Sequence, residues 1–378
     1  MKYPTLVGGL VTICASTLPM AASAQSVVTI YGVVDAGVTH VTNGGSGNAN
    51  LQTSGGYGTS RFGFRGVEDL GGGLRASFAL EAGMANDTGT GQPSNSNNQA
   101  SGAGTGTGLT FNRLAYVALS GGFGEVHLGR DFALAHLNTL SFDAFNNNGV
   151  AKANSLVYGI VGTGPLYTTQ LVSNTISYTL PKTLGGVYGG VMLGMGENPS
   201  GAANSKDGNY YAARLGYAQG PLDVAGAYSQ TKYVGTATLG DYTHANLGAS
   251  YDAGFAKFFA LYNRVEVDLA PGKVRKNTVD VGAHIPVSPQ SKIRVSYAML
   301  SDGSSNSLRN ANGSARDTND ARLIGIGYVH DLSKRTALYG SYAHLTNKGQ
   351  GTYGVIGGYA PMPGQNSSGV EMGLRHIF

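Results

Sequence analysis

Charged side chains recur at alternating positions in the first third of the chain. Arg61 and Arg65 share a face of one segment, Arg75 and Glu81 share a face of the next, and Arg113 follows on the same face of a third. Residues two apart in an extended segment project to the same side. A ladder of fixed guanidinium groups attracts anions, and carboxylates nearby moderate that attraction. The chemistry that this pattern favours is electrostatic selection of ions.

Three further charged residues lie where an alternating segment runs into a long apolar connection. Arg130 is out of phase with Glu125 and His127, so its direction stays open. Asp131 and Asp143 are the acids that could oppose the arginines. The alternative is that the arginines are ordinary solvated side chains or partners in salt bridges within one wall.

No sequence pattern typical of a catalytic site is present. Eight histidines occur, but none lies in H-E-x-x-H, and no G-x-S-x-G elbow is found. Gly104, Gly106 and Gly108 have neither a strand before them nor a helix after them that would indicate a nucleotide site. We therefore expect no enzyme activity, no cofactor and no metal site.

Composition narrows the class of protein. The 378 residues include 60 glycines, only 12% are charged, the net charge is +4, and the mean hydropathy is -0.08. Glycine at this level without a collagen repeat indicates turns and close-packed strands. No basic run appears, so we expect no nucleic-acid partner.

The first 24 residues have the form of a secretory signal. A lysine precedes an apolar stretch that ends in Ala22-Ser23-Ala24, an A-x-A cleavage pattern. The predicted mature chain is a single domain, residues 25–378. Cys14 is the only cysteine and would leave with the signal, so no disulfide is expected.

The remaining chain consists of segments of roughly 10 residues with alternating hydrophobicity, separated by turn residues. "VVTIYGVVDAGVTHV" and "SRFGFRGVEDLGGGLRASFALEAG" are clear examples, and short connections alternate with long ones rich in Gly, Ser and Asn. The pattern predicts sixteen strands, an even number that brings both chain ends to one rim. Their expected starts are Val27, Ser60, Leu74, Phe111, Gly124, Asn174, Val187, Tyr210, Leu222, His244, Ala256, Asn277, Lys292, Arg322, Thr336 and Ser368.

The last segment, "GVEMGLRHIF", alternates to its final residue. Leu374, His376 and Phe378 share one face, and Glu371 and Arg375 share the other. A strand that pairs with the first strand would close a barrel without an edge. Sixteen strands leave a water-filled lumen, whereas eight fill themselves with side chains. We therefore predict an all-β, transmembrane, antiparallel sixteen-stranded barrel.

Several segments resemble the general porins of Gram-negative bacteria, of the Neisseria and Burkholderia type. The most specific are "SRFGFRGVEDLGGGLRASFALE", "AYVALSGGFGEVHLGR", "YVHDLSKRTALYGSYAHLTN" and the terminal "MGLRHIF". The resemblance implies an outer-membrane homotrimer that passes small hydrophilic solutes passively and contacts membrane lipid and lipopolysaccharide. It also implies that Phe378, His376 and Leu374 form the signal read by the barrel assembly machinery.

In the resembled family the third external loop folds into the pore, and its acids face arginines of the early strands. The connection after Arg130 is apolar enough to pack inside, although a disordered external loop is the alternative. Arg61, Arg113, Glu81 and Asp143 match the family's charged positions. Relatives often carry another basic residue where this chain has Leu171 and Val172, so we expect only a mild anion preference. The competing interpretations are a non-conducting barrel that acts as an adhesin or hydrolase, and a secreted soluble β-protein.

Overall fold

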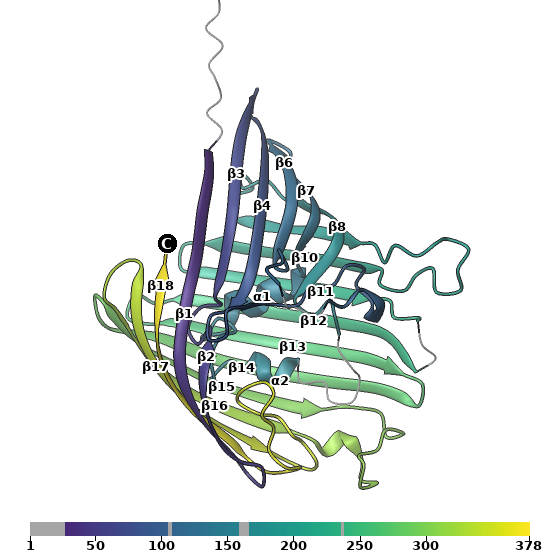
Figure 1. The fold of residues 1–378 in the computed structure, drawn as a ribbon, viewed down its shortest axis with the longest axis vertical. Coiled ribbons are helices and arrows are strands. Elements are labelled where there is room, and N and C mark those ends of the chain that lie inside the picture. The colour runs from purple at the N-terminus through teal and green to yellow at the C-terminus, as the bar shows by residue number, and fades with distance from the viewer. Residues whose placement is uncertain (1–26, 105–107, 159–165, 236–237) are drawn as a thin grey trace, which may run out of the picture.

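The chain forms a closed barrel of antiparallel strands (Figure 1). The computed structural model describes residues 27–104, 108–158, 166–235 and 238–378. The predicted signal segment, residues 1–24, lies outside the described residues. No helix among these residues is long and apolar enough to cross a membrane, a finding that does not bear on β-barrels.

The strands up to the middle of the barrel are β1 (Val27–Asn43), β2 (Gly47–Ser54), β3 (Arg61–Gly71), β4 (Leu74–Ala85), β5 (Thr90–Gly91), β6 (Leu114–Gly121), β7 (Gly124–Phe132), β8 (Leu171–Thr179) and β9 (Val187–Gly194). Those that follow are β10 (Tyr210–Gln219), β11 (Leu222–Thr231), β12 (Leu239–Asp252), β13 (Lys257–Leu269), β14 (Gly272–Ser288), β15 (Ser291–Asp302), β16 (Ala321–Asp331), β17 (Thr336–Asn347) and β18 (Ser367–Ile377).

The wall of the barrel has sixteen strand positions, as the sequence predicts. β2 and β3 both pair with β1, β2 along its second half and β3 along its first half, so the two share one wall position. β5 is a two-residue ladder on β4. Of the eighteen described strands, β5 therefore adds no wall position and β2 and β3 count as one. The predicted sixteen-stranded barrel is confirmed.

The first and last strands close the barrel. β1 pairs with β18 from Val33 opposite Ile377 to Asn43 opposite Ser367. Phe378 exchanges two backbone hydrogen bonds with Gly32, at 3.1 and 3.2 Å. The backbones of the first and last strands thus pair along the seam, which a lipid-immersed wall requires because lipid offers no hydrogen bonds.

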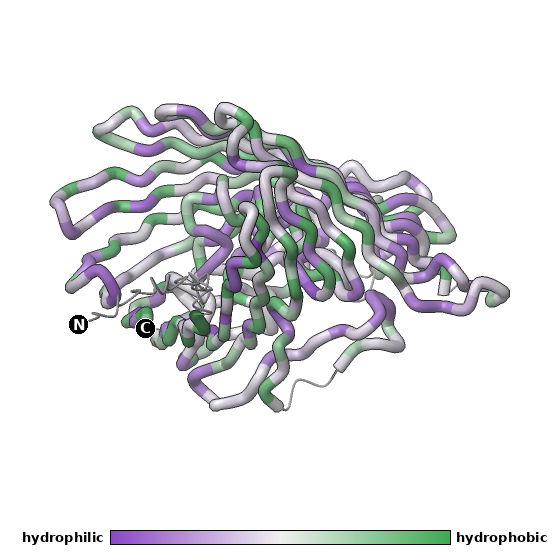
Figure 2. The backbone as a smooth tube through the Cα atoms, turned by 90° about the horizontal axis from the view of Figure 1, so that it is seen from above, coloured by the Kyte–Doolittle hydropathy of each residue, from purple (hydrophilic) through white to green (hydrophobic). Residues whose placement is uncertain are grey.

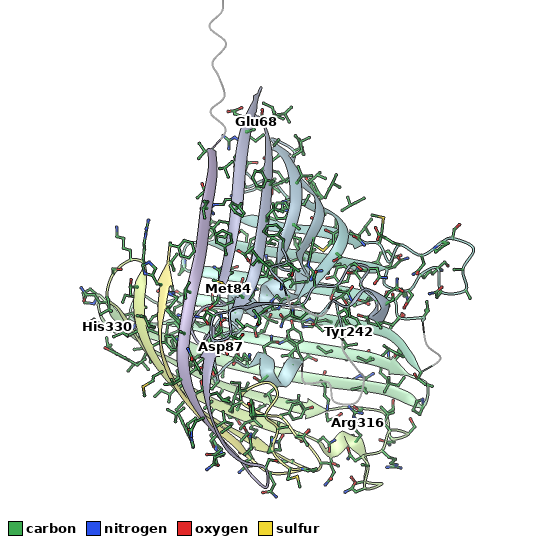
Figure 3. All side chains as sticks on the ribbon, in the orientation of Figure 1. Glu68, Met84, Asp87, Tyr242, Arg316 and His330 are labelled. Carbon is green, nitrogen blue, oxygen red and sulfur yellow. The ribbon has the colours of Figure 1, made fainter. Side chains whose placement is uncertain are left out.

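Side chains alternate between the two faces of the wall. Along β1, Val34 and Val38 are exposed on the outside, whereas Asp35 and Thr39 are buried inside. Figure 2 shows the same alternation of hydrophilic and hydrophobic residues along the strands. Short turns gather at one rim, near Glu68 and His330, and long loops at the other, near Arg316 and Tyr242 (Figure 3). This arrangement is typical of outer-membrane barrels.

The connection between β7 and β8 folds into the barrel, as predicted. It carries two short α-helices, α1 (Leu134–Phe142) and α2 (Asn154–Val157). We call its described residues, 133–158 and 166–170, the inward loop. Phe142 and Phe145 have no exposed surface. α1 contacts the walls formed by β10 to β13, and α2 contacts β14 and β15. The disordered external loop considered from the sequence is excluded for these residues.

Glycines of the wall allow the inward loop to lie close. A Cβ at Gly248 of β12 would overlap the Phe142 ring, and a Cβ at Gly325 of β16 would lie 2.6 Å from the Cβ of Ala151. Larger side chains at these wall positions would displace the loop toward the pore axis. The glycines therefore help to fix how far the loop intrudes.

Some strand starts differ from the predictions. β6 begins at Leu114 rather than near Phe111, and β8 begins three residues before Asn174. β12 begins at Leu239 and β14 at Gly272, five residues earlier than expected in both cases. At the early ends of β12 and β14 the buried side chains, such as Tyr242 and Val274, are apolar and the outward ones are polar, the reverse of the middle of the wall. β2, in the polar stretch after Asn43, was not predicted because alternation gives no signal where both faces are polar.

Substituting Gly248 tests the seat of the inward loop. We expect G248A to destabilise the folded barrel by roughly 1 to 3 kcal/mol, the usual cost of overpacking, because the added methyl group meets Phe142. The measurement is urea unfolding in detergent micelles.

The matched control is G226A on the neighbouring strand β11, where an added Cβ has its nearest neighbour at 3.7 Å. Equal midpoints for G248A and the unsubstituted protein would contradict the assignment of Gly248 as a loop seat.

Candidate functional site

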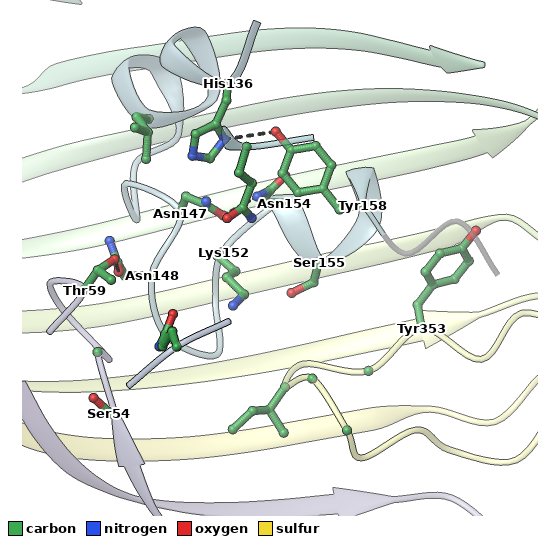
Figure 4. Close-up of a pocket in the computed structure, with 18 of the residues that line it drawn as sticks. Ser54, Thr59, His136, Asn147, Asn148, Lys152, Asn154, Ser155, Tyr158 and Tyr353 are labelled. Carbon is green, nitrogen blue, oxygen red and sulfur yellow. Dashed lines mark hydrogen bonds between the residues drawn. The ribbon is translucent and has the colours of Figure 1, made fainter. Parts of the chain in front are cut away.

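A cavity of about 660 Å³ lies between the inward loop and the loops at the long-loop rim (Figure 4). Most of its lining is neutral and polar, including Thr59, Asn147, Asn148 and Asn154. Its charged lining residues are Arg113 and Lys152, and no carboxylate occurs among the described lining residues. An ion entering from this rim therefore meets fixed positive charge.

Arg61, Arg113 and Glu81 lie together on the inner wall, as the sequence predicts. β3 and β4 place Arg61 opposite Gly83, and β4 pairs with β6 directly after Arg113. Glu81 accepts from Arg113 Nε at 2.6 Å and lies 3.3 Å from Arg61 Nε. One carboxylate shared by two guanidinium groups leaves this cluster, which we call the Arg61 triad, with a net charge of +1.

Two other predicted arginines lie toward the short-turn rim. Arg65 is four residues along β3 from Arg61, roughly 13 Å, and stacks over the Tyr31 ring at 5.1 Å. Arg75 of β4 lies opposite Asp69 of β3 in the strand register, beside the short turn. Six residues, or roughly 20 Å, separate Arg75 from Glu81 along β4. Arg75 therefore lies apart from the Arg61 triad, whereas Arg65 borders it through Tyr31, whose hydroxyl hydrogen-bonds to Glu81.

Arg130 and Asp131 take separate positions on β7. The Arg130 guanidinium donates to the backbone oxygens of Asn112 and Asn95, the latter at 3.0 Å, and to Ser173. It ties a loop to the wall and does not join the triad. Asp131 Oδ2 lies 3.0 Å from His127 Nδ1. Glu125 contacts the other nitrogen of the same ring, so Asp131 belongs to a wall cluster around that histidine.

Asp143 lies at the end of α1 and is almost completely buried. Its carboxylate accepts from the backbone N–H groups of Phe145 at 2.9 Å and Asn147 at 3.0 Å. Burial raises the pKa of Asp143 to about 6, although these two hydrogen bonds and the positive charges of Arg294 and Lys152 oppose the shift. Its positively charged neighbours are thus Arg294 of the wall strand β15 and Lys152 of the inward loop, rather than the arginines of the Arg61 triad.

Lys152 is a cation that the sequence analysis did not single out. It lies between α1 and α2 and points into the cavity (Figure 4). Burial lowers the pKa of Lys152, and the charges of Glu371 and Asp143 counteract the shift. Strand parity assigns faces only in extended segments, so no sequence signal could have placed a side chain of this irregular loop.

A second basic cluster surrounds Tyr57, which lies between β2 and β3. Arg294 stacks at 4.8 Å from its ring centroid and Arg375 at 4.4 Å, and Lys292 Nζ is 5.7 Å away. Arg294 also lies 4.3 Å from the Phe145 ring, so this arginine holds the inward loop and the Tyr57 segment together. Alternation in "KIRVSY" could have placed Lys292 and Arg294 on one face, although nothing in it indicates their common partner.

His136, in the inward loop, adds no charge to the passage. Its Nδ1 lies 3.0 Å from Tyr158 Oη and 3.0 Å from Thr139 Oγ1. Burial lowers the pKa of His136 to about 3, with a further contribution from Arg113. The ring is therefore neutral at physiological pH. Among the described residues no cluster of three or more His, Cys, Asp or Glu side chains could hold a metal ion.

The terminal residues face outward as the alternation predicts. Leu374 is exposed on the outer wall, and His376 Nδ1 lies 2.9 Å from Thr336 Oγ1 of the neighbouring strand. The Phe378 ring packs over Gly32. These residues form one side of the seam between β18 and β1.

Comparisons of this chain with a family model and with related proteins indicate the same protein family. The model of the Gram-negative porin family matches residues 10–350. Outer membrane porin protein 32 of Delftia acidovorans is 34% identical over 366 residues, which cover 95% of this chain and 96% of that protein. Major outer membrane protein P.IB of Neisseria meningitidis serogroup B is 26% identical over 380 residues, 98% of this chain and 99% of the relative.

Solved structures agree. An anion-selective porin from Comamonas acidovorans superposes with a TM-score of 0.79 at 33% identity, over 94% of this chain and 100% of that one. The trimer form of OmpT, an outer membrane protein of Vibrio cholerae, gives a TM-score of 0.64 at 14% identity, over 93% and 99% of the two chains. At that identity the second match supports the fold alone.

The Arg61 triad yields a prediction about ion preference. E81Q removes the carboxylate that neutralises one of the two arginines, so the anion-to-cation permeability ratio should rise by about twofold. A unit charge roughly 8 Å from an ion in water contributes about 0.5 kcal/mol, which salt screening reduces to about 0.2 kcal/mol, with opposite signs for an anion and a cation. The measurement is the reversal potential across a planar bilayer under a salt gradient.

The matched control for E81Q is E68Q, which removes a carboxylate near the short turn of β3. An unchanged or lower anion-to-cation ratio in E81Q would show that the triad does not lie on the ion path.

The pKa of Asp143 predicts a pH dependence. Between pH 7.5 and pH 5 this carboxyl gains a proton, so the inward loop loses one negative charge and anion preference should rise. The folded-state pKa of about 6 exceeds the ordinary 3.8. The contribution of Asp143 to stability is therefore greatest at low pH and declines as the pH rises through 6.

D143N should reduce the change in reversal potential between pH 5 and 7.5, whereas D69N, at an exposed turn, should leave it intact. The same pH response in D143N and the unsubstituted protein would assign the titration to other groups.

Proposed function

Because the chain belongs to the Gram-negative porin family, we propose that its pore prefers anions and that Lys152 and the Arg61 triad, which includes Arg113, set this preference. The protein is an outer-membrane porin, a β-barrel that lets small hydrophilic solutes diffuse passively. The observation that carries the proposal is the cavity beside the inward loop, whose charged lining residues are Arg113 and Lys152.

The preference should be mild. Glu81 neutralises half of the charge of Arg61 and Arg113, and Asp143 lies close to Arg294 and Lys152. Such compensated charges leave a small net field, in contrast to an uninterrupted basic ring. Arg65, Arg75 and Arg130 would act at other depths of the wall, and Asp131 would remain with His127.

We further propose that the chain acts without catalysis. Glu81 holds Arg61 and Arg113, and Glu125 and Asp131 contact His127, so these lumen groups are engaged in contacts within the wall. Passive diffusion requires only a wide, wet passage with fixed charges.

The assembly of the protein is proposed from the family. We infer a homotrimer in contact with outer-membrane lipid and lipopolysaccharide, and a signal peptide spanning residues 1–24. In this proposal Leu374, His376 and Phe378 are read by the barrel assembly machinery. They lie on the seam strand, whose backbone pairing completes the barrel.

Reversal potentials of variants test the proposed anion preference. R113A and K152Q should each lower the anion-to-cation permeability ratio by about twofold, because each removes one unit charge from the passage. R75A is the matched control and should retain the original ratio.

If R113A, K152Q and R75A all lowered the anion-to-cation permeability ratio equally, the total charge of the lumen, and not the position of each residue, would determine the ion preference. A cation-signed potential in the unsubstituted protein would refute the proposal. A folded protein without ohmic conductance would exclude an open pore.

A further inference from the structure

Three asparagine–glycine pairs occur in the sequence: Asn43-Gly44, Asn148-Gly149 and Asn312-Gly313. An asparagine is chemically labile before glycine, because the next backbone nitrogen can reach the side-chain amide carbon and glycine has no Cβ to hinder the approach. In a folded protein the reaction depends on how firmly that nitrogen is held. The structure holds the three pairs differently.

Two of the pairs are fastened by backbone hydrogen bonds. The Gly44 N–H donates to the Asn366 carbonyl at 2.9 Å, and the Gly313 N–H donates to the Asn310 carbonyl at 2.9 Å. Asn43 is also buried. In both pairs the glycine nitrogen would have to leave its acceptor before it could attack the preceding side chain.

The third pair, in the inward loop, has an unengaged nitrogen. In the part of the chain that the structure describes, the Gly149 N–H donates to no acceptor. The glycine itself is required by the fold, because a Cβ at this position would overlap Glu371 Oε1 and lie 2.5 Å from the Gly56 carbonyl oxygen. The packing of the inward loop therefore keeps a reactive pair in place.

The Asn148 side chain is held at the cavity beside the inward loop (Figure 4). Its Oδ1 accepts from Thr59 Oγ1 at 3.0 Å, and its Nδ2 donates to the backbone oxygen of Asn146 at 2.6 Å. A donor on Oδ1 stabilises the negative charge that this oxygen acquires when Cγ is attacked. Asn148 and Gly149 are partly exposed, so water from the passage reaches them.

We propose that Asn148 deamidates spontaneously in the folded porin and that the product places a new carboxylate in the passage. The Gly149 nitrogen forms a bond to Asn148 Cγ, the Cγ–Nδ2 bond breaks, and ammonia leaves with the proton of the Gly149 N–H. Water then opens the resulting cyclic imide to aspartate or isoaspartate. Each event consumes one water molecule and releases one ammonia molecule.

The product changes the charge of the cavity. The charged residues of its described lining are Arg113 and Lys152, so a carboxylate at position 148 lowers the net charge of this lining from +2 to +1. Anion preference should therefore decline as the protein ages. Only this electrical consequence rests on the proposed function, and the modification itself does not.

The test is peptide mapping by mass spectrometry of the folded protein after storage in detergent at mildly alkaline pH. Digestion in isotopically labelled water marks the amides that are lost during preparation. Asn148 should deamidate about tenfold faster than Asn43 or Asn312, which corresponds to about 1.4 kcal/mol, the order of one backbone hydrogen bond. In the denatured chain the three asparagines should react at similar rates.

N148Q is the matched variant, because glutamine would have to close a larger ring. Its anion-to-cation permeability ratio should stay constant during storage, whereas the ratio of the unsubstituted protein should fall toward that of N148D, about twofold lower. T59V should slow the deamidation, because Asn148 Oδ1 then loses its donor.

Equal rates at Asn148 and Asn312 in the folded protein, or an amide at Asn148 that outlasts the one at Asn43, would overturn the proposal. Complete deamidation of Asn148 with a constant permeability ratio would refute its second part, the carboxylate in the passage. The mass change at Asn148 is read without reference to ion preference, so a failure of the proposed function would be distinguished from a failure of this inference.

Discussion

Phe142 and Phe145 are completely buried inside a barrel that is otherwise wide enough to hold water. Their burial holds the inward loop against the wall, and the loop in turn positions Lys152 and Asp143. Glycines at the contact allow the close approach, and Arg294 connects the Phe145 ring to that of Tyr57. The width of the passage and the placement of its charges both follow from this packing.

The charges of the lumen form two clusters. The Arg61 triad lies on β3, β4 and the segment before β6. Lys292 and Arg294 of β15 and Arg375 of β18 surround Tyr57, and only β1 separates β18 from β3. Carboxylates accompany both groups, Glu81 in the first and Asp143 beside Arg294. An ion passing the loop thus encounters compensated fields, which favours a broad passage for small solutes over tight binding of one of them.

Strand alternation was sufficient to predict the wall. The period of two assigned Arg61, Glu81 and Arg113 to one face, and pairing of adjacent strands then brought them together. Alternation failed where both faces are polar, as in β2, and where the backbone is irregular, as at Lys152. Parity alone specifies a face, but the six-residue spacing of Arg75 and Glu81 along one predicted strand already separates them by roughly 20 Å.

The inward loop could be predicted as apolar, but its contacts could not. Which wall each of its charges approaches depends on the path of the loop through the lumen, and that path is determined by long-range packing against β10 to β15. The expected opposition of Asp143 to the early arginines depends on this path, and the structure places Arg294 and Lys152 next to Asp143 instead.

The central claim is that the inward loop lies in the conducting path with Lys152 beside it. It is tested most directly by modifying K152C, in a chain whose Cys14 is replaced, with a negatively charged methanethiosulfonate reagent during single-channel recording. The account predicts a stepwise fall in conductance and a lower anion-to-cation permeability ratio after each reaction, since a negative group then replaces a positive one at the cavity. Complete modification of the cysteine without any change in conductance or permeability ratio would contradict it.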